Sequence, residues 1–183
     1  MGKVIFDISM SLDGLITAAH ARPEAGLGEG GERLHDWGFN SADPRNREIM
    51  EWYANTGANI FGRTGYDHSI LHWGADGPAG AARIPTVIVS HSVPQNVPEG
   101  GVYSFVDSVE AALETAKELA GDKDIYITGA DVARQALKGG LIDEVSIHLV
   151  PVLFGRGRRL FEGLDGEHTA LEILEVIRTA EAI

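Results

Sequence analysis

The residues best suited to chemistry form a small turn, Thr128-Gly129-Ala130, between an expected strand and an expected helix. Glycine lets a ligand approach the backbone closely, and the free N–H groups at the start of a helix attract an anion such as a phosphate. An ordinary tight crossover between a strand and a helix would have the same pattern, so both interpretations stay open for the turn alone.

The elements around this turn must hold it in place. Ile125-Tyr126-Ile127 is rich in β-branched and aromatic residues, which is typical of a buried strand. Asp131 to Leu137 has apolar residues at helical spacing, and Gly139-Gly140 after it is a typical helix end. Glu144 to Val150 is predicted to be the next strand, because Pro151 lacks the backbone N–H that would continue a ladder.

Four motifs occur in order between Asp124 and Phe161: TGAD, GGLIDEV, LVPVLFG and GRGRRLF. This stretch resembles the reductases grouped around dihydrofolate reductase, and most of all the reductase domain of bacterial riboflavin-biosynthesis deaminase-reductases. The resemblance implies a dihydrofolate reductase-like three-layer α/β fold with a mixed, mainly parallel central sheet, and a reductase that uses NADPH. The alternation of strands and helices along the chain also favours this fold class. Val4 to Met10 alternates in character and is predicted to be the first strand, and Ser108 is predicted to cap a helix from Val109 to Ala120. We expect residues 1–183 to form a single reductase domain.

The resemblance also implies a cofactor site. GRTGY, residues 62–66, is similar to a family turn that binds cofactor phosphates, although Gly65 stands where a threonine often occurs. Arg63 would suit oxygen atoms because a guanidinium can form two parallel hydrogen bonds, but it could equally be an ordinary surface arginine. Ser90-His91 stands where relatives hold a hydroxyl and a basic residue for the adenosine 2′-phosphate. The implied cofactor-binding residues are Ser9, Ile16, Thr17, Gly62, Arg63, Thr64, Ser90, His91, Thr128, Gly129, Ala130, Asp131, Val132 and Ala133.

Two loops are expected beside the nicotinamide end of the cofactor. SLDG, residues 11–14, is by itself typical of a surface hairpin, but it resembles the nicotinamide-side loop of the family. By this resemblance Ser9, Ile16 and Thr17 would approach the nicotinamide, while Asp13 and Gly14 would shape the turn. Asp13 is not assigned as a proton donor, and the catalytic residues stay unassigned. His20 to Gly31 has no periodicity and is predicted to be a loop that could close over the cofactor.

The candidate substrate-binding residues are Trp37, Glu48, Arg156 and Arg158. Trp37 and Phe39 are either packing residues or a wall of the substrate pocket. A helix is predicted from the Ser41-Pro44 start to about Thr56, and folate reductases offer a carboxylate from the corresponding helix. Asp43, Glu48 and Glu51 are candidates for that carboxylate, and a solvated helix face explains these charges equally well. The GRGRR loop either balances local charge or contacts a substrate phosphate.

Composition excludes several functions. The chain has no cysteine, which rules out disulfides and thiolate zinc sites, and no metal is expected. The bifunctional relatives carry a cysteine-ligated zinc deaminase, so the resemblance implies only the reductase activity. A formal net charge of −12 argues against a nucleic-acid partner. No apolar run approaches the ~20 residues that span a bilayer, so no membrane partner and a cytoplasmic location are expected.

The C-terminal part raises the question of assembly. Leu171 to Ile177 alternates apolar and charged residues and is predicted to be an antiparallel strand. The family usually adds one more strand, so either the sequence is shortened or a partner covers the sheet edge, and a homodimer is expected. The preferred function is NADPH-dependent reduction of a heterocyclic riboflavin precursor, 5-amino-6-(5-phosphoribosylamino)uracil. The alternatives are a dihydrofolate or pteridine reductase and a nucleotide-binding module without catalysis.

Overall fold

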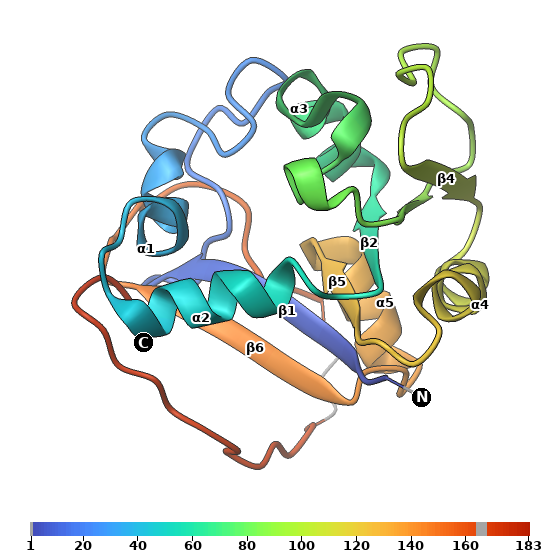
Figure 1. Ribbon diagram of the computed structural model, residues 1–183. Coiled ribbons are helices and arrows are strands. Elements are labelled where there is room, and N and C mark those ends of the chain that lie inside the picture. Colours follow the sequence, from blue (N-terminus) through green and yellow to red (C-terminus); the bar gives the residue numbers. More distant parts are fainter. Residues whose placement is uncertain (1, 164–167) are drawn as a thin grey trace.

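The computed structural model describes residues 2–163 and 168–183. Six strands in these residues form one sheet in the order β4-β3-β2-β5-β1-β6, and each of their pairings is parallel (Figure 1). The predicted α/β class with a mainly parallel sheet is therefore confirmed. The strands are β1 Val4–Ser11, β2 Ala58–Gly62, β3 Thr86–Val89, β4 Tyr103–Val106, β5 Ile125–Thr128 and β6 Glu144–Val150.

Helices cover both faces of the sheet. On one face α4 (Val109–Ala120) and α5 (Ala130–Lys138) pack against the strands, and α2 (Pro44–Tyr53) and α3 (Arg63–Trp73) lie on the other (Figure 1). A four-residue helix, α1 (Asp36–Phe39), precedes α2, and the short 3₁₀ turns are Gly31–His35, Gly74–Asp76 and Gly80–Ala82. Among the described helices, none has the length and apolar character needed to cross a membrane.

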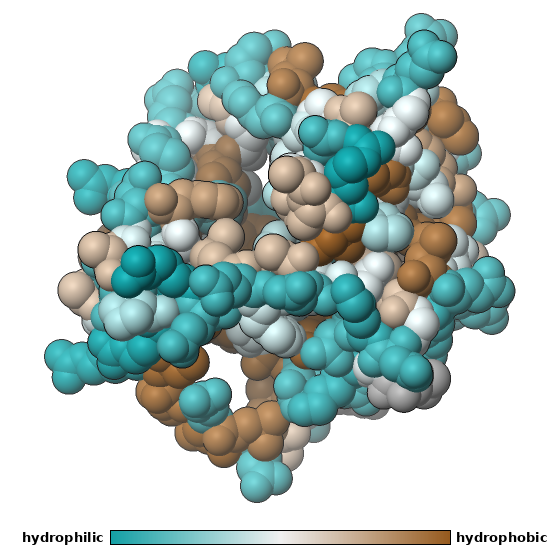
Figure 2. All heavy atoms as spheres, viewed as in Figure 1, coloured by the Kyte–Doolittle hydropathy of each residue, from teal (hydrophilic) through white to brown (hydrophobic). Residues whose placement is uncertain are grey.

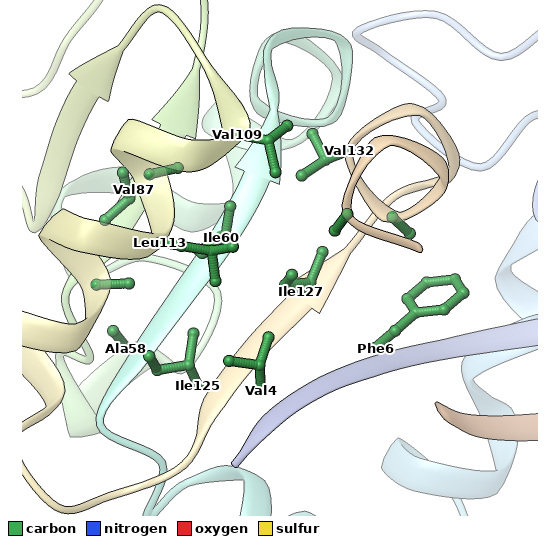
Figure 3. Packing of buried hydrophobic residues seen from close by; sticks show 14 of the residues in the cluster. Val4, Phe6, Ala58, Ile60, Val87, Val109, Leu113, Ile125, Ile127 and Val132 are labelled. Carbon is green, nitrogen blue, oxygen red and sulfur yellow. The ribbon is translucent and has the colours of Figure 1, made fainter. Parts of the chain in front are cut away.

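The main core lies between the sheet and the α4–α5 layer, and strand periodicity explains it. Side chains alternate between the two faces of a strand, so Val4 and Phe6 of β1 enter this core, where Phe6 is fully buried. Asp7, Ser9 and Ser11 therefore project from the opposite face. Figure 3 shows the core side chains meeting between the layers: Val4, Phe6, Ala58, Ile60, Val87, Val109, Leu113, Ile125, Ile127 and Val132.

Local polar groups set the helix ends. Ser108 Oγ accepts a hydrogen bond of 3.2 Å from Ala111 N and caps α4, as predicted. Asp43 caps α2 by accepting from Arg45 N at 2.9 Å. This helix ends at Tyr53, three residues before the predicted Thr56. Thr56 Oγ1 instead donates to Tyr53 O at 2.9 Å, a bond that satisfies a terminal carbonyl while the chain turns into β2.

The predicted strand from Leu171 to Ile177 is wrong. This segment has no strand assignment, and four of its large apolar side chains are 65–82% exposed: Leu171, Ile173, Leu174 and Val176. A strand requires a neighbour for its backbone groups, and none of the described residues pairs with this segment. The chain bonds to the sheet again at Ile183. Ile183 N donates to Leu149 O of β6 at 3.1 Å, and Leu149 N donates to Ile183 O at 2.7 Å.

We expect the exposed segment to mediate self-association as a homodimer. Its apolar side chains are exposed along the loop at the bottom of Figure 2, and β6 is an edge strand of the sheet, which natural proteins usually cover. Replacing Ile173, which is 82% exposed, by Lys should shift the protein toward monomer in light scattering at micromolar concentration. The matched change Leu119→Lys on α4 should leave the mass unchanged. A wild-type protein that is purely monomeric would contradict the prediction.

Candidate cofactor and substrate site

The predicted cofactor-binding turns lie side by side at the carboxyl edge of the sheet. Gly62 and Arg63 follow β2, Ser90 follows β3, and Gly129 follows β5. Because β2 lies between β3 and β5, these three turns are neighbours. Ligands of open α/β sheets bind at this edge, where successive turns present their backbone groups.

Two helices begin at these turns. Gly62 is the N-cap of α3 and Gly129 the N-cap of α5, and neither helix receives a side-chain cap bond. Gly129 has φ 104°, a conformation that favours glycine, so a larger residue there would be strained. The first-turn N–H groups of both helices therefore offer hydrogen bonds and partial positive charge to an anion.

Arg63 connects the ends of β2 and β3. Its Nε donates to Asp67 Oδ1 and Oδ2 at 2.7 and 2.9 Å, and Nη1 donates to Ser90 Oγ at 3.2 Å and Ser92 O at 3.1 Å. These bonds orient the guanidinium at the sheet edge, while about a third of the side chain (35%) remains exposed. Arg63 borders an open groove of about 580 Å³ lined by Pro23, Arg63, Asp67, Ile70, Leu71, Pro94, Gln95 and Asn96.

The segment from His20 to Gly31 contains no α-helix or strand up to the 3₁₀ turn at its end, as predicted for a loop. It packs closely against α3. Gly26 lies so near this helix that an added Cβ would be 2.7 Å from His68 O. Pro23 of the same loop lines the groove beside Arg63. Its role as a lid stays a prediction, and its position at the carboxyl edge is the one a lid would need.

The SLDG and GRGRR loops dock on each other. Asp13 accepts hydrogen bonds from Phe154 N at 3.2 Å and Gly155 N at 2.7 Å. Ile16 N donates to Arg158 O at 2.8 Å, and Arg158 N donates to Thr17 Oγ1 at 3.1 Å. The nicotinamide-side candidates Ile16 and Thr17 are thus held by a segment about 140 residues later in the chain.

Asp13 serves as a fixed hydrogen-bond acceptor. The hydroxyl of Ser11, and then the backbone N–H groups of Gly155 and Phe154, lower the pKa of Asp13 to about 2. A carboxyl group with this pKa carries no proton near neutral pH. The structure therefore agrees with Asp13 as a turn-shaping residue.

We expect the contact between these loops to weaken in acid. The folded pKa of Asp13 lies below its ordinary value of 3.8, so its stabilising contribution is complete above about pH 4 and is lost as the pH falls through about 2. Amide resonances of Phe154 and Gly155 should titrate with a midpoint near 2 in NMR spectra. In Asp13→Asn this transition should be absent, and a midpoint at 3.8 or above in the wild-type protein would refute the assignment.

Arg158 lies at the start of α5. Its guanidinium is paired with Asp131, which also pairs with Arg134. Partial burial opposes ionisation of Asp131, yet Arg158 and Arg134 hold the pKa of this carboxyl below its usual value. Arg158 therefore stands beside the predicted phosphate turn, whereas Arg156 and Arg159 are exposed on the loop. Substrate contacts by Arg156 and Arg158 stay a prediction.

The other cofactor candidates differ in what they can offer. Ala130, Val132 and Ala133 are buried in the main core, so only their backbone can meet a ligand. The hydroxyl of Thr128 donates to Asp7 O at 3.1 Å and ties β5 to β1. Thr64 and His91 are exposed at the same edge of the sheet.

On the opposite side of β1, Trp37 packs in a second core cluster with Leu34, Val150 and Ala182, and it also makes polar contacts. It is 6% exposed, donates from Nε1 to Ser9 Oγ at 2.9 Å, and stacks on His148 with ring centroids 3.8 Å apart. The structure thus brings a substrate candidate and a nicotinamide candidate into direct contact. Phe39 is 69% exposed, so its interpretation as a packing residue is wrong.

The acidic candidates of α2 do not supply a buried carboxylate to the cluster around Trp37. Glu48 and Glu51 are exposed, and the role of Glu48 stays a prediction. Asp43 caps the helix, and its hydrogen bonds with Arg45 lower its pKa to about 2. The acidic group beside this cluster is instead the partly buried Asp7 of β1, whose Oδ2 lies 2.8 Å from Nε2 of His148.

Sequence reasoning did not single out Asp7 or His148. The available signal was an ionisable residue in the middle of each of two strands, Asp7 in Val4–Ser11 and His148 in Glu144–Val150. Neither strand reveals that the two are neighbours, because β1 and β6 lie 141 residues apart in sequence at this contact. Among the described residues, no group of three or more His, Cys, Asp or Glu is arranged to hold a metal ion.

Comparison with known proteins identifies the family of the chain. Residues 2–183 match the sequence model described as the RibD C-terminal domain. The chain belongs to the RibD C-terminal domain family. None of the curated protein sequences compared with it matches significantly.

Solved structures include several with the same fold. A protein of Shewanella sp. PV-4 assigned to riboflavin biosynthesis is 26% identical, with a TM-score of 0.57 over 90% of this chain and 86% of that one. RibD of Acinetobacter baumannii is 21% identical, with a TM-score of 0.63 over 100% of this chain and 56% of that one.

A Thermotoga maritima protein described as a diaminohydroxyphosphoribosylaminopyrimidine deaminase/5-amino-6-(5-phosphoribosylamino)uracil reductase is 14% identical, with a TM-score of 0.61. The comparison covers 99% of this chain and 54% of the Thermotoga protein. The chain thus spans just over half the length of the Acinetobacter and Thermotoga proteins, and their identities below 25% show the fold alone.

Proposed function

We propose that this protein is an NADPH-dependent reductase that acts on a heterocyclic, imine-bearing substrate of the riboflavin-precursor type. The observation that carries the proposal is the pair of glycine-capped helix starts, α3 and α5, on the neighbouring strands β2 and β5. Two such N-termini at one sheet edge suit the two linked phosphates of a dinucleotide. Membership of the RibD C-terminal domain family supports the reductase class.

The residues present fit this cofactor. The acidic chain has a net charge of −12, so an anionic ligand requires local positive groups, and Arg63 together with the two helix starts supplies them. Ser90 and Ser92 surround the Arg63 guanidinium and supply hydroxyl groups where a 2′-phosphate would distinguish NADPH from NADH. When bound, NADPH supplies a hydride from C4 of its nicotinamide.

The rest of the site positions and shields the reactants. Ile16 and Thr17, fixed by the GRGRR loop, form the nicotinamide side. In Figure 2 the surface is hollowed above α2, between the segment that follows β1 and α3, where both reactants would meet. A substrate with a sugar phosphate would find Arg156 exposed on the same side as the docked loops.

The test is to supply NADPH with 5-amino-6-(5-phosphoribosylamino)uracil or with dihydrofolate and to follow the nicotinamide absorbance. We expect NADPH oxidation with the aminopyrimidine. Turnover of dihydrofolate alone would favour a pteridine reductase. NADPH binding without oxidation of either substrate would indicate a nucleotide-binding module.

A further inference from the structure

A partly buried acid–base pair lies on the face of the sheet opposite the main core. The side chains of His148 and Asp7 are 10% and 17% exposed, and they meet at 2.8 Å. In the parallel register Ser9 is opposite His148 and Asp7 is opposite Ser146, so the two are diagonal neighbours on adjacent strands. Burial of an ionisable pair is costly, and such pairs are common where a protein moves protons.

This pair is joined to the predicted nicotinamide side. Trp37 stacks on the imidazole of His148 and donates its indole N–H to Ser9, one of the expected nicotinamide neighbours. The contacts therefore run from Asp7 through His148 and Trp37 to Ser9, without a gap. The imidazole has a fixed orientation, which general acid catalysis requires.

The other polar groups nearby are less suited to donate a proton. Asp13 and Asp43 are held as carboxylates by hydrogen bonds. Tyr53 and Tyr126 pack beside Asp7, and burial, followed by the charge of Asp7, raises the pKa of both phenols far above neutrality. His35 is a further titratable group near the pair, and burial lowers the pKa of its imidazole.

We propose that His148, oriented by Asp7, is the catalytic acid of this reductase and delivers the proton that must accompany the hydride. The proposal rests on the reductase function given above. When the carbon of a C=N bond accepts the hydride, the π electron pair moves to nitrogen. That nitrogen forms a bond to the proton of His148, and the electrons of the broken N–H bond stay on the imidazole. The substrate gains two electrons, and NADPH loses them.

The geometry indicates which proton is transferred. Nε2 of His148 lies 2.8 Å from Asp7 Oδ2, so in the proposed step this carboxylate accepts the Nε2 hydrogen and fixes the orientation of the ring. The transferable proton then resides on Nδ1. Asp7 acts as the positioning residue. Solvent restores the proton, since the pair retains some exposed area.

The first experiment replaces each member of the pair. We expect His148→Gln and Asp7→Asn to lower kcat by about 10²- to 10⁴-fold, with little change in KM and with NADPH affinity retained. The double variant should be no slower than the slower single variant, because the two residues act as a unit. Glu114→Gln on the opposite helix α4 is the control and should keep full activity.

A second measurement separates this proposal from the proposed function. In the ¹⁵N-histidine NMR spectrum, the His148 resonances are identified by their loss in His148→Gln. Addition of the unreactive pyrimidine 5,6-diaminouracil should move them, and less so in Asp7→Asn. This measurement needs no turnover. NADPH titration and circular dichroism verify that each variant is folded. If His148→Gln or Asp7→Asn does not fold, His148→Asn or Asp7→Ser takes its place.

The outcomes are distinct. If wild-type protein oxidises no NADPH with the aminopyrimidine, the proposed function fails, and movement of the His148 resonances alone decides whether the pair faces the ligand. Unmoved His148 resonances, while other resonances show binding, would overturn the proposal. So would a folded His148→Gln variant with wild-type kcat and an unchanged pH profile.

Discussion

Replacing Arg63 by Ala is expected to weaken NADPH binding by roughly 1–3 kcal/mol, or about 5- to 150-fold in the dissociation constant. The guanidinium is already oriented by Asp67 and by Ser90, so little side-chain freedom remains to be lost when it meets a phosphate. Fluorescence titration of the protein with NADPH measures the change.

The size of the effect should depend on salt and on the cofactor. A contact between a charged group and phosphate weakens as ionic strength rises, so the difference between wild type and Arg63→Ala should shrink in high salt. Arg83→Ala is the matched control, because Arg83 is also paired with an acid, Asp76, but lies away from the glycine-capped turns. Equal NADPH affinities for wild type and Arg63→Ala would remove Arg63 from the site.

Replacing Gly157 by Ala is expected to separate the two docked loops. The added Cβ would lie 1.8 Å from the backbone oxygen of Thr17, and Gly157 has φ 154°, which L side chains rarely adopt. Because the added Cβ would meet a backbone atom, the loop must move. We expect the clash to lower the free energy of unfolding by about 1–3 kcal/mol, in addition to the strain of the backbone. Denaturant unfolding measures this loss.

Gly155→Ala provides the matched control within the same loop. Gly155 also has positive φ, +70°, but an added Cβ meets nothing within 4 Å. In this variant the free energy of unfolding should fall by only about 1–2 kcal/mol, because alanine is strained in the left-handed conformation. Gly157→Ala should also weaken NADPH binding, since Ile16 and Thr17 lose their support, whereas Gly155→Ala should not. Equal stability and affinity for the two variants would contradict the docking argument.

The local elements could be predicted from the sequence because their causes are local. Apolar alternation in Val4–Ser11, the cap at Ser108 and the glycine at position 129 each act within a few residues. The same holds for the two phosphate-type turns, whose glycines and following helices are contiguous in the chain. The order of these elements was then enough to place both turns at one edge of a parallel sheet.

The acid–base pair and the docked loops were decided only by the tertiary structure. Asp7 meets His148 because β6 pairs with β1 in one register, and a shift of that register by a single residue would send His148 to the opposite face. Asp13 finds its backbone partners 141 and 142 residues away for the same reason. The segment from Leu171 to Ile177 is the opposite case, because here a local pattern failed to predict the structure. Its alternation is typical of a strand, but a strand forms only beside a neighbouring strand, which the local sequence does not specify.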